Sequence, residues 1–376
     1  MPTIVRAADA AQFLSLVPHL LGFVPSRSLV VVPMCRGRSL GAMRVDLPAD
    51  PAGAASDAVA ATVVGMACRI ADADGAMVVV YTDAAVTGIL PHRALVQSLC
   101  DRADACGLPI ADALVVAADG WGSYLDRDLA PGGRPLTELV THDGPGGTAA
   151  PVGDQASGAA LPKPDGAARA AVAQAARALD AALTAICGIA PSAAASRSAS
   201  PRIDPAALEA ACELDDLPSL FEQALEWNPV SLAPMRAAMI GWCLGRPALR
   251  DVALVQWASD QAGGDVAMDA QRKWEDGAEY PSDLASVMWG EGRRPDPQRL
   301  EGALELARVV AALLPKARRA GALAVCGWLA WALGRSTHAD RYAAQALRIE
   351  RRHGLAEIVR SFVAAGHLPD WAFRPE

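Results

Sequence analysis

Short runs of consecutive apolar residues, separated by turn residues, mark the first part of the chain. Residues 29–47 combine a valine-rich run, an Arg-Gly-Arg turn and a looser alternation, which predicts a β-hairpin. Two further runs, at 77–81 and 113–117, are short and continuously apolar, as in strands covered on both faces. Another short strand is expected at 121–125. The pattern therefore predicts a β-sheet.

Two segments between these strands space their apolar residues at helical intervals, 57–73 and 92–106. The order strand, helix, strand, helix, strand implies right-handed parallel crossovers, with the hairpin extending the sheet in antiparallel fashion. Residues 1–126 are therefore predicted to form an α/β domain with a mixed sheet.

Proline, glycine, serine and alanine dominate the next stretch. Residues 127–204 are predicted to be a flexible connector that contains one Ala-rich helix at 167–187. From residue 205 onward every predicted element is helical, and Asp204 and Asp296 are candidate helix N-caps. The predicted fold class is α/β plus all-α, with a helical-hairpin domain at 205–376.

One short sequence occurs twice in this helical part. Trp-Cys-Leu-Gly-Arg at 242–246 matches Trp-Ala-Leu-Gly-Arg at 331–335. A tetratricopeptide repeat has a similar Trp, Leu and Gly pattern, but with one more residue between Trp and Leu. We therefore favour generic helical hairpins over a true repeat of that type.

Composition and charge narrow the class of protein. The chain has 376 residues, 52% hydrophobic and 20% charged, which excludes a wholly disordered or collagen-like protein. This length fits two domains. The net charge of −8 argues against a protein that mainly coats nucleic acid.

The eight cysteines include no Cys-x-x-Cys motif, and most lie in apolar runs where a free thiol behaves as a small hydrophobe. We therefore expect a reduced, cytoplasmic protein. The apolar stretch at 13–24 lacks a clean signal-peptide cleavage site, and 320–334 is too short to cross a bilayer. Neither export nor a membrane span is expected.

Common catalytic signatures do not occur in the sequence. It contains no phosphate-binding loop, no dinucleotide-binding Gly-x-Gly-x-x-Gly, no His-Glu-x-x-His and no Gly-x-Ser-x-Gly. No cofactor and no metal site are predicted, and catalytic residues are not assigned.

Acidic residues follow the predicted strands at one edge of the sheet. Asp83 and Asp119 come directly after the two buried strands, and the hairpin adds Asp46. Ligands bind beyond the carboxyl ends of strands in open parallel sheets, so these carboxylates could hold Mg²⁺ or act as acid and base. The favoured interpretation is that each one caps a helix or turn.

Three further residues are candidates for ligand binding in the same domain. His19 lies in a predicted helix-breaking turn, Arg27 precedes the first strand, and Trp121 follows the second buried strand. A buried hydrogen-bonding role is favoured over catalysis for His19, and a core role is favoured for the tryptophans.

Basic residues exceed acidic ones after residue 293. On the predicted helix 337–352, Arg341, Arg348 and Arg352 share one face. This face is a candidate surface for an acidic protein or nucleic acid, although a solvated face is the favoured interpretation and nucleic acid is not an expected partner.

Several motifs resemble one family. The sequence Val-Pro-His-Leu-Leu-Gly-Phe-Val-Pro-Ser-Arg-Ser-Leu-Val-Val-Val at 17–32, followed by Arg-Val-Asp-Leu-Pro at 44–48, is similar to the opening of the actinobacterial domain of unknown function 4192 family. Agreement continues at 120–121, 133–136 and 327–331. The resemblance implies an actinobacterial, cytoplasmic protein and supplies no activity, cofactor or partner.

Three hypotheses of function follow from the sequence. The first is a non-enzymatic module whose helical domain binds a protein partner of unknown identity. The second is a ligand-binding or metal-dependent enzyme with its site at the strand ends. The third and weakest is nucleic-acid binding through the basic helix.

Overall fold

The computed structural model describes residues 7–50, 53–139, 151–188 and 203–374. The chain forms two compact units, one of Met1–Ser157 with Phe373–Glu376 and the other of Gly158–Ala372. The division falls inside the predicted connector 127–204. Residues 140–150 and 189–202 of that connector lie outside the described residues.

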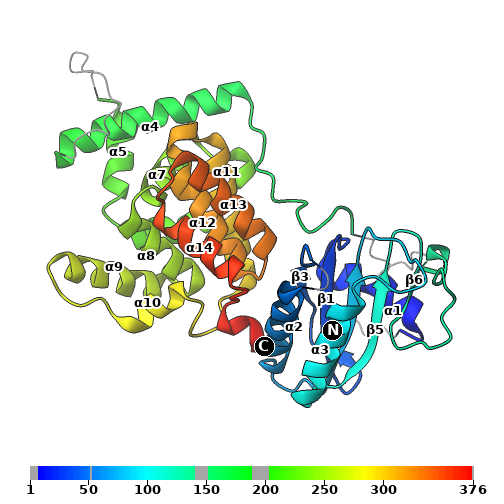
Figure 1. The fold of residues 1–376 in the computed structure, drawn as a ribbon. Helices are drawn as coiled ribbons and strands as arrows, with labels where there is room; N and C mark the ends of the chain where they lie inside the picture. The colour runs from blue at the N-terminus through cyan, green and yellow to red at the C-terminus, as the bar shows by residue number, and fades with distance from the viewer. Residues whose placement is uncertain (1–6, 51–52, 140–150, 189–202, 375–376) are drawn as a thin grey trace. The chain divides into compact units, whose positions relative to one another are not determined.

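The first unit is built on one mixed sheet (Figure 1). Its strands are β1 (Ser28–Cys35), β2 (Arg38–Ser39), β3 (Met43–Asp46), β4 (Gly75–Tyr81), β5 (Ile110–Val116) and β6 (Trp121–Ser123). Their order is β2-β1-β4-β5-β6, and β3 also pairs with β1. The predicted hairpin, both buried strands and the short last strand are thus present, and the mixed α/β class is confirmed.

The direction of the strands refines the prediction. Among the described strands, β4 and β5 are the one pair that runs in parallel, and the crossover helix α3 (Arg93–Ala105) joins them. β1 is antiparallel to both β3 and β4, so the crossover through α2 (Ala54–Cys68) joins two strands that point the same way with β1 between them. The hairpin therefore forms one end of the sheet and extends it in antiparallel fashion, as predicted.

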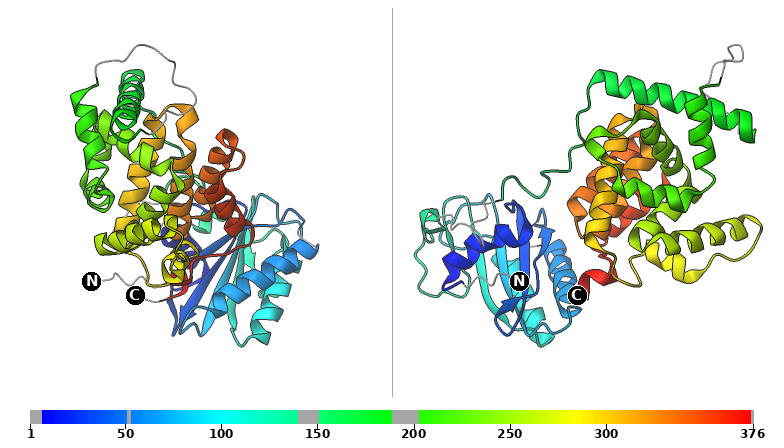
Figure 2. Two further views of the ribbon diagram at one scale, coloured as in Figure 1. Left: turned by 90° about the vertical axis from the view of Figure 1, so that its left-hand side faces the viewer. Right: turned by 180° about the vertical axis from the view of Figure 1, so that it is seen from behind.

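Helices cover both faces of the sheet (Figures 1 and 2). α2 and α3 pack against each other on one face, and α1 (Ala10–Leu21) packs on the other. The α1 face carries a core that includes Val30, Val79 and Leu114, all fully buried. Alternate residues of β1 and β4 are buried on both sides, as the continuous apolar runs predicted.

The described residues of the second unit form helices and the loops that join them. Its helices are α4 (Gly166–Cys187), α5 (Pro205–Glu213), α6 (Leu217–Glu226), α7 (Pro234–Leu244), α8 (Pro247–Ala258), α9 (Gln261–Glu275), α10 (Ser282–Met288), α11 (Pro297–Leu313), α12 (Ala320–Ala332), α13 (Ser336–Ile349) and α14 (Gly354–Ala364). Short 3₁₀ turns occur at η1 (Leu136–Leu139) in the first unit and at η3 (Pro229–Ser231), η4 (Lys316–Arg318) and η5 (Asp370–Phe373).

Helix α12 is the centre of this unit. Every one of its residues is buried, because α7, α8, α11, α13 and α14 surround it. Asp204 and Asp296 cap α5 and α11 as predicted, each accepting a hydrogen bond from a backbone amide of the first turn.

The Ala-rich helix α4 belongs to this helical unit. It is long and apolar enough to cross a membrane by length and composition alone. Its buried residues, among them Val172, Leu179 and Leu183, pack into the core of the unit, where α4 lies against α5 and α7. One face of α4 is thus accounted for by helix packing.

Candidate functional site

The sheet register brings part of the predicted strand-end site together. Asp46 pairs with Ser28, Ser28 with Tyr81, Tyr81 with Val116, and Val116 with Trp121. These residues form one row across the sheet and so project from the same face. Asp83 and Asp119 lie beyond the row, at the ends of β4 and β5.

The three carboxylates have separate surroundings. Asp119 accepts a hydrogen bond from the backbone amide of Val86 at 2.8 Å, and Asp46 forms an ion pair with Arg44. Asp83 is exposed. Over the described ranges, no three His, Cys, Asp or Glu side chains are grouped so that they could hold a metal ion. Asp119 thus links the loop after β5 to the loop after β4.

His19 does not lie in a helix-breaking turn, so that expectation is wrong. Helix α1 continues through Pro18 and ends at Leu21, because Gly22 takes the left-handed conformation (φ 77°) and donates to the carbonyl of Pro18 at 2.8 Å. His19 is half-buried in the last turn of α1. Arg27 is exposed, and its carbonyl accepts a hydrogen bond from Leu47.

Trp121 is a core residue. It is 3% exposed and packs with Leu14, Val79 and Leu114 under α1. Its indole N–H has no partner among the described residues, and the guanidinium of Arg134 lies 5.3 Å from its ring centroid. The ring therefore fixes the short edge strand β6 to the sheet.

The predicted stripe of three arginines is not continuous. α13 ends at Ile349 because Glu350 takes an extended conformation (φ −128°, ψ 101°), and a turn follows. Arg341 and Arg348 are exposed on α13, whereas Arg352 lies in the turn before α14. The expected helix 337–352 is therefore too long at its C-terminal end. That nucleic acid is not a partner stays a prediction.

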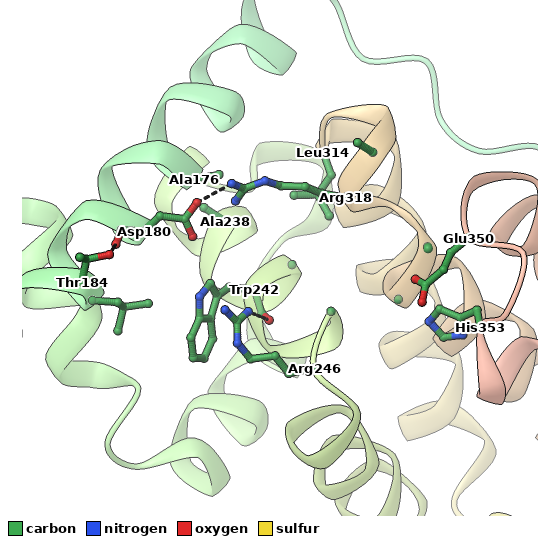
Figure 3. A pocket seen from close by; sticks show the side chains of 16 residues that line it. Ala176, Asp180, Thr184, Ala238, Trp242, Arg246, Leu314, Arg318, Glu350 and His353 are labelled. Atoms are coloured by element: carbon green, nitrogen blue, oxygen red, sulfur yellow. Dashed lines mark hydrogen bonds and ion pairs between the residues drawn. The ribbon is translucent and has the colours of Figure 1, made fainter. Parts of the chain in front are cut away.

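A pocket of about 260 Å³ lies in the helical unit (Figure 3). Residues from α4, α7, η4 and the start of α12 line it, together with the segment between α13 and α14. Its charged and aromatic side chains are Asp180, Trp242, Arg246, Arg318, Glu350 and His353.

Small residues shape the pocket. The end of α7 and the start of α12 approach closely at Gly321, where a Cβ atom would overlap the carbonyl oxygen of Leu244. At Gly241 a Cβ atom would come within 2.8 Å of the Leu314 side chain. Glycine is therefore required at Gly321, where the overlap is with backbone, whereas at Gly241 the flexible Leu314 side chain would have to move.

Two arginines enter the pocket in different ways. Arg318 forms an ion pair with Asp180 of α4. The guanidinium of Arg246 stacks over the ring of Trp242 with its carbon 3.5 Å from the ring centroid, and its Nη1 donates to the Trp242 carbonyl at 2.8 Å. In Figure 3 these two pairs lie close together, with Glu350 and His353 farther along the pocket.

Burial changes the pKa values of two pocket groups. Desolvation lowers the pKa of the half-buried Arg246, an effect that the nearby Asp180 opposes and Arg318 reinforces. Desolvation also lowers the pKa of His353, and Arg250 adds to this shift while Glu350 opposes it. His353 is therefore neutral near pH 7, and the pocket holds a partly desolvated arginine.

The sequence analysis did not assign this pocket. It noted the repeated Trp-x-Leu-Gly-Arg motif but not that its two copies differ in environment. Trp331 is fully buried and donates to the carbonyl of His367, whereas Trp242 is half-buried beside Arg246. The half-buried Trp–Arg pair is a property of helix packing, so only the structure could show it.

Comparison with known proteins identifies a family. No curated protein and no solved structure matches the chain. The family model described as Domain of unknown function (DUF4192) matches residues 11–278, which include the whole sheet and the pocket residues Asp180, Trp242 and Arg246. The chain therefore belongs to the DUF4192 family.

Proposed function

We propose that this chain is a non-enzymatic protein-interaction module, and that its helical unit binds the partner. The observation that carries the proposal is Arg246. This arginine is half-buried in a pocket, and none of the described carboxylates forms an ion pair with it. A partly desolvated arginine that forms no ion pair keeps N–H donors with which it can bind an anionic group.

The shape of the site also supports binding rather than catalysis. The pocket offers an aromatic face at Trp242 and an apolar helix wall, which are features of protein-binding surfaces. Among the described residues of the α/β unit, no three carboxylate, His or Cys side chains are grouped to hold a metal ion, so this unit offers less support for the metal-dependent enzyme alternative. We propose a reducing cytoplasm as the setting, where the eight free cysteines would remain thiols.

The scarcity of lysine provides a sharp test. The only lysines are Lys163, Lys273 and Lys316. Lys316 is exposed in η4 next to the pocket residues Ala317 and Arg318, and Lys273 is exposed on α9, away from the pocket lining. The full chain is treated in cells of its native host with an amine-reactive cross-linker, and the conjugates are purified and mapped by mass spectrometry.

We expect a protein partner attached through Lys316, and expect Lys316→Arg to remove that conjugate while Lys273→Arg does not. The absence of any conjugate, or conjugates at Lys273 alone, would count against the helical unit as the binding part. Turnover of a small molecule by the purified chain would favour the enzyme alternative.

A further inference from the structure

We infer that the Arg246 pocket binds a peptide carboxylate, either the free C-terminus or an Asp or Glu side chain of the partner. This inference rests on the proposed function, since it names the chemistry by which the helical unit would recognise its partner. It is argued from the hydrogen-bonding capacity of Arg246, from the second copy of the same motif, and from the charge and size of the pocket.

Arg246 has donors to spare. A guanidinium carries five N–H donors, and among the described residues the Arg246 side chain donates only to the carbonyl of Trp242. Stacking on Trp242 fixes the plane of the guanidinium, because the ring holds it 3.5 Å from the centroid. A flat, oriented guanidinium with unused N–H groups matches the bidentate geometry of a carboxylate.

The second copy of the motif shows what such an arginine binds within the chain. Arg335 follows Trp331-Ala-Leu-Gly as Arg246 follows Trp242-Cys-Leu-Gly. Nη2 of Arg335 lies 2.7 Å from a carboxylate oxygen of Glu301. The equivalent position at Arg246 has no such carboxylate among the described residues, so a carboxylate from another molecule would complete the same pairing.

The charge of the pocket favours a monoanion. Asp180 already neutralises Arg318, and Glu350 lies on the pocket lining near His353, which is neutral at pH 7. The lining as a whole carries no net charge, and Arg246 is the one of its two arginines that forms no ion pair with a described residue. A phosphate dianion would place a second negative charge near Asp180 and Glu350, whereas a carboxylate matches the single available charge.

The size of the pocket indicates that only part of a ligand enters. Its volume of about 260 Å³ lies below the roughly 300–1,000 Å³ of pockets that enclose a drug-sized molecule. A chain end or one acidic side chain fits such a space, and the remainder of the peptide would lie on the adjoining surface of α4 and α7. This favours a peptide over a free metabolite.

The test uses the full chain and four arrays of random synthetic peptides. The first array has free C-termini and no Asp or Glu, the second has amidated C-termini with Asp or Glu inside, the third is amidated and without acids, and the fourth is amidated with phosphoserine. Peptides that bind are then titrated individually. We expect binders in the first or second array, which separates the two sources of the carboxylate, and none in the third.

Variants that are expected to weaken or to tighten peptide binding test the inference. Arg246→Gln is expected to lower the affinity for the titrated peptides at least tenfold. Arg246→Lys keeps the charge but loses the forked N–H groups of the guanidinium, so its affinity should lie between those of Arg246→Gln and the wild type. Asp180→Asn is expected to tighten binding, because it releases Arg318 and removes a nearby negative charge. Arg348→Gln, on exposed α13, is the matched control and should change nothing.

The inference fails if no carboxylate peptide binds, if the fourth array binds best, or if binding ignores both Arg246→Gln and Asp180→Asn. Misfolding cannot produce the gain in affinity that is expected for Asp180→Asn. This variant therefore still tests the inference if Arg246→Gln fails to fold. If any of these results occurs although the Lys316 conjugate forms in cells, the proposed interaction module is retained and only the peptide carboxylate as its ligand is rejected.

Discussion

His353 begins helix α14 as a buried side chain. Its Nδ1 accepts a hydrogen bond from the backbone amide of Ala356 at 3.4 Å, a role that only the neutral ring can play. Burial, reinforced by Arg250, lowers the pKa of His353. A histidine in solution titrates near about 6.5, so below that pH the unfolded chain takes up the proton more readily than the folded one.

We therefore predict that the free energy of unfolding falls as the pH drops below 7.5. The fall begins near the pKa of a free histidine and ends below the lowered pKa of His353. His353→Asn keeps a capping oxygen and cannot titrate, so its stability should depend less on pH in this window. Urea unfolding at pH 7.5 and 5.5 measures the difference. Glu222, whose pKa Arg299 holds down, loses its contribution only in more acidic solution. Equal pH dependence in both proteins would contradict the assignment.

The two strand-end carboxylates Asp83 and Asp119 are expected to differ in their contribution to stability. Asp119 accepts a hydrogen bond from the backbone amide of Val86, a buried residue, whereas Asp83 is exposed. Asp119→Ala is predicted to cost about 1–2 kcal/mol, and Asp83→Ala no more than about 0.5 kcal/mol, in urea unfolding. If instead Mg²⁺ raises the wild-type melting temperature and both variants abolish the rise, the strand-end carboxylates would form a metal site and would not act only in local structure.

Helix packing at the pocket depends on glycine. Gly321 sits where α12 meets the backbone at the end of α7, and its Cβ would overlap the carbonyl of Leu244. Gly321→Ala is therefore predicted to destabilise the helical unit by about 1–3 kcal/mol. Gly302 of α11 is the matched control, since a Cβ there meets nothing within 4 Å and alanine favours helix.

Thermal and urea unfolding of both variants tests this pair. Gly302→Ala should be neutral or up to about 1 kcal/mol more stable, because the helix gains propensity without a clash. If Gly321→Ala were equally well tolerated, the close approach of α7 and α12, and with it the wall of the pocket, would be wrong.

The elements could be predicted where local pattern decides them. The continuous run at 77–81 gave a buried strand, and Asp296 before a proline gave the start of α11. The predicted ends of two helices were wrong, near Pro18 and near Arg352. α1 continues through Pro18 close to its C-terminus, and α13 ends where Glu350 takes an extended conformation, although no glycine or proline occurs there.

The pocket could not be predicted, because it depends on residues far apart in the sequence. Asp180 and Arg318 form an ion pair across 138 positions, and Gly321 matters only because α7 ends beside it. The sequence marks Trp242 and Trp331 as equivalent, but packing buries one and leaves the other half-buried beside an arginine. Periodicity identifies faces of helices and does not tell which faces meet.

At the scale of the whole chain, each unit has a hydrophobic core of its own. Leu114 is fully buried in the core under α1, and Leu304 is 4% exposed in the core around α12. Separate cores of this size are what domains need to fold on their own. Tryptophan fluorescence reports mainly on the second unit, since Trp121 is in the first unit and all the others lie between residues 227 and 371.

We predict that the two units unfold in separate thermal transitions. Leu114→Ala and Leu304→Ala remove the same atoms from the two cores and should each cost about 2–5 kcal/mol, because a buried leucine leaves a cavity that the surroundings fill only in part. In calorimetry each variant should shift a different transition. Tryptophan fluorescence should follow mainly the transition that Leu304→Ala lowers. A single transition, lowered by both variants, would show instead that the two cores unfold as one cooperative unit.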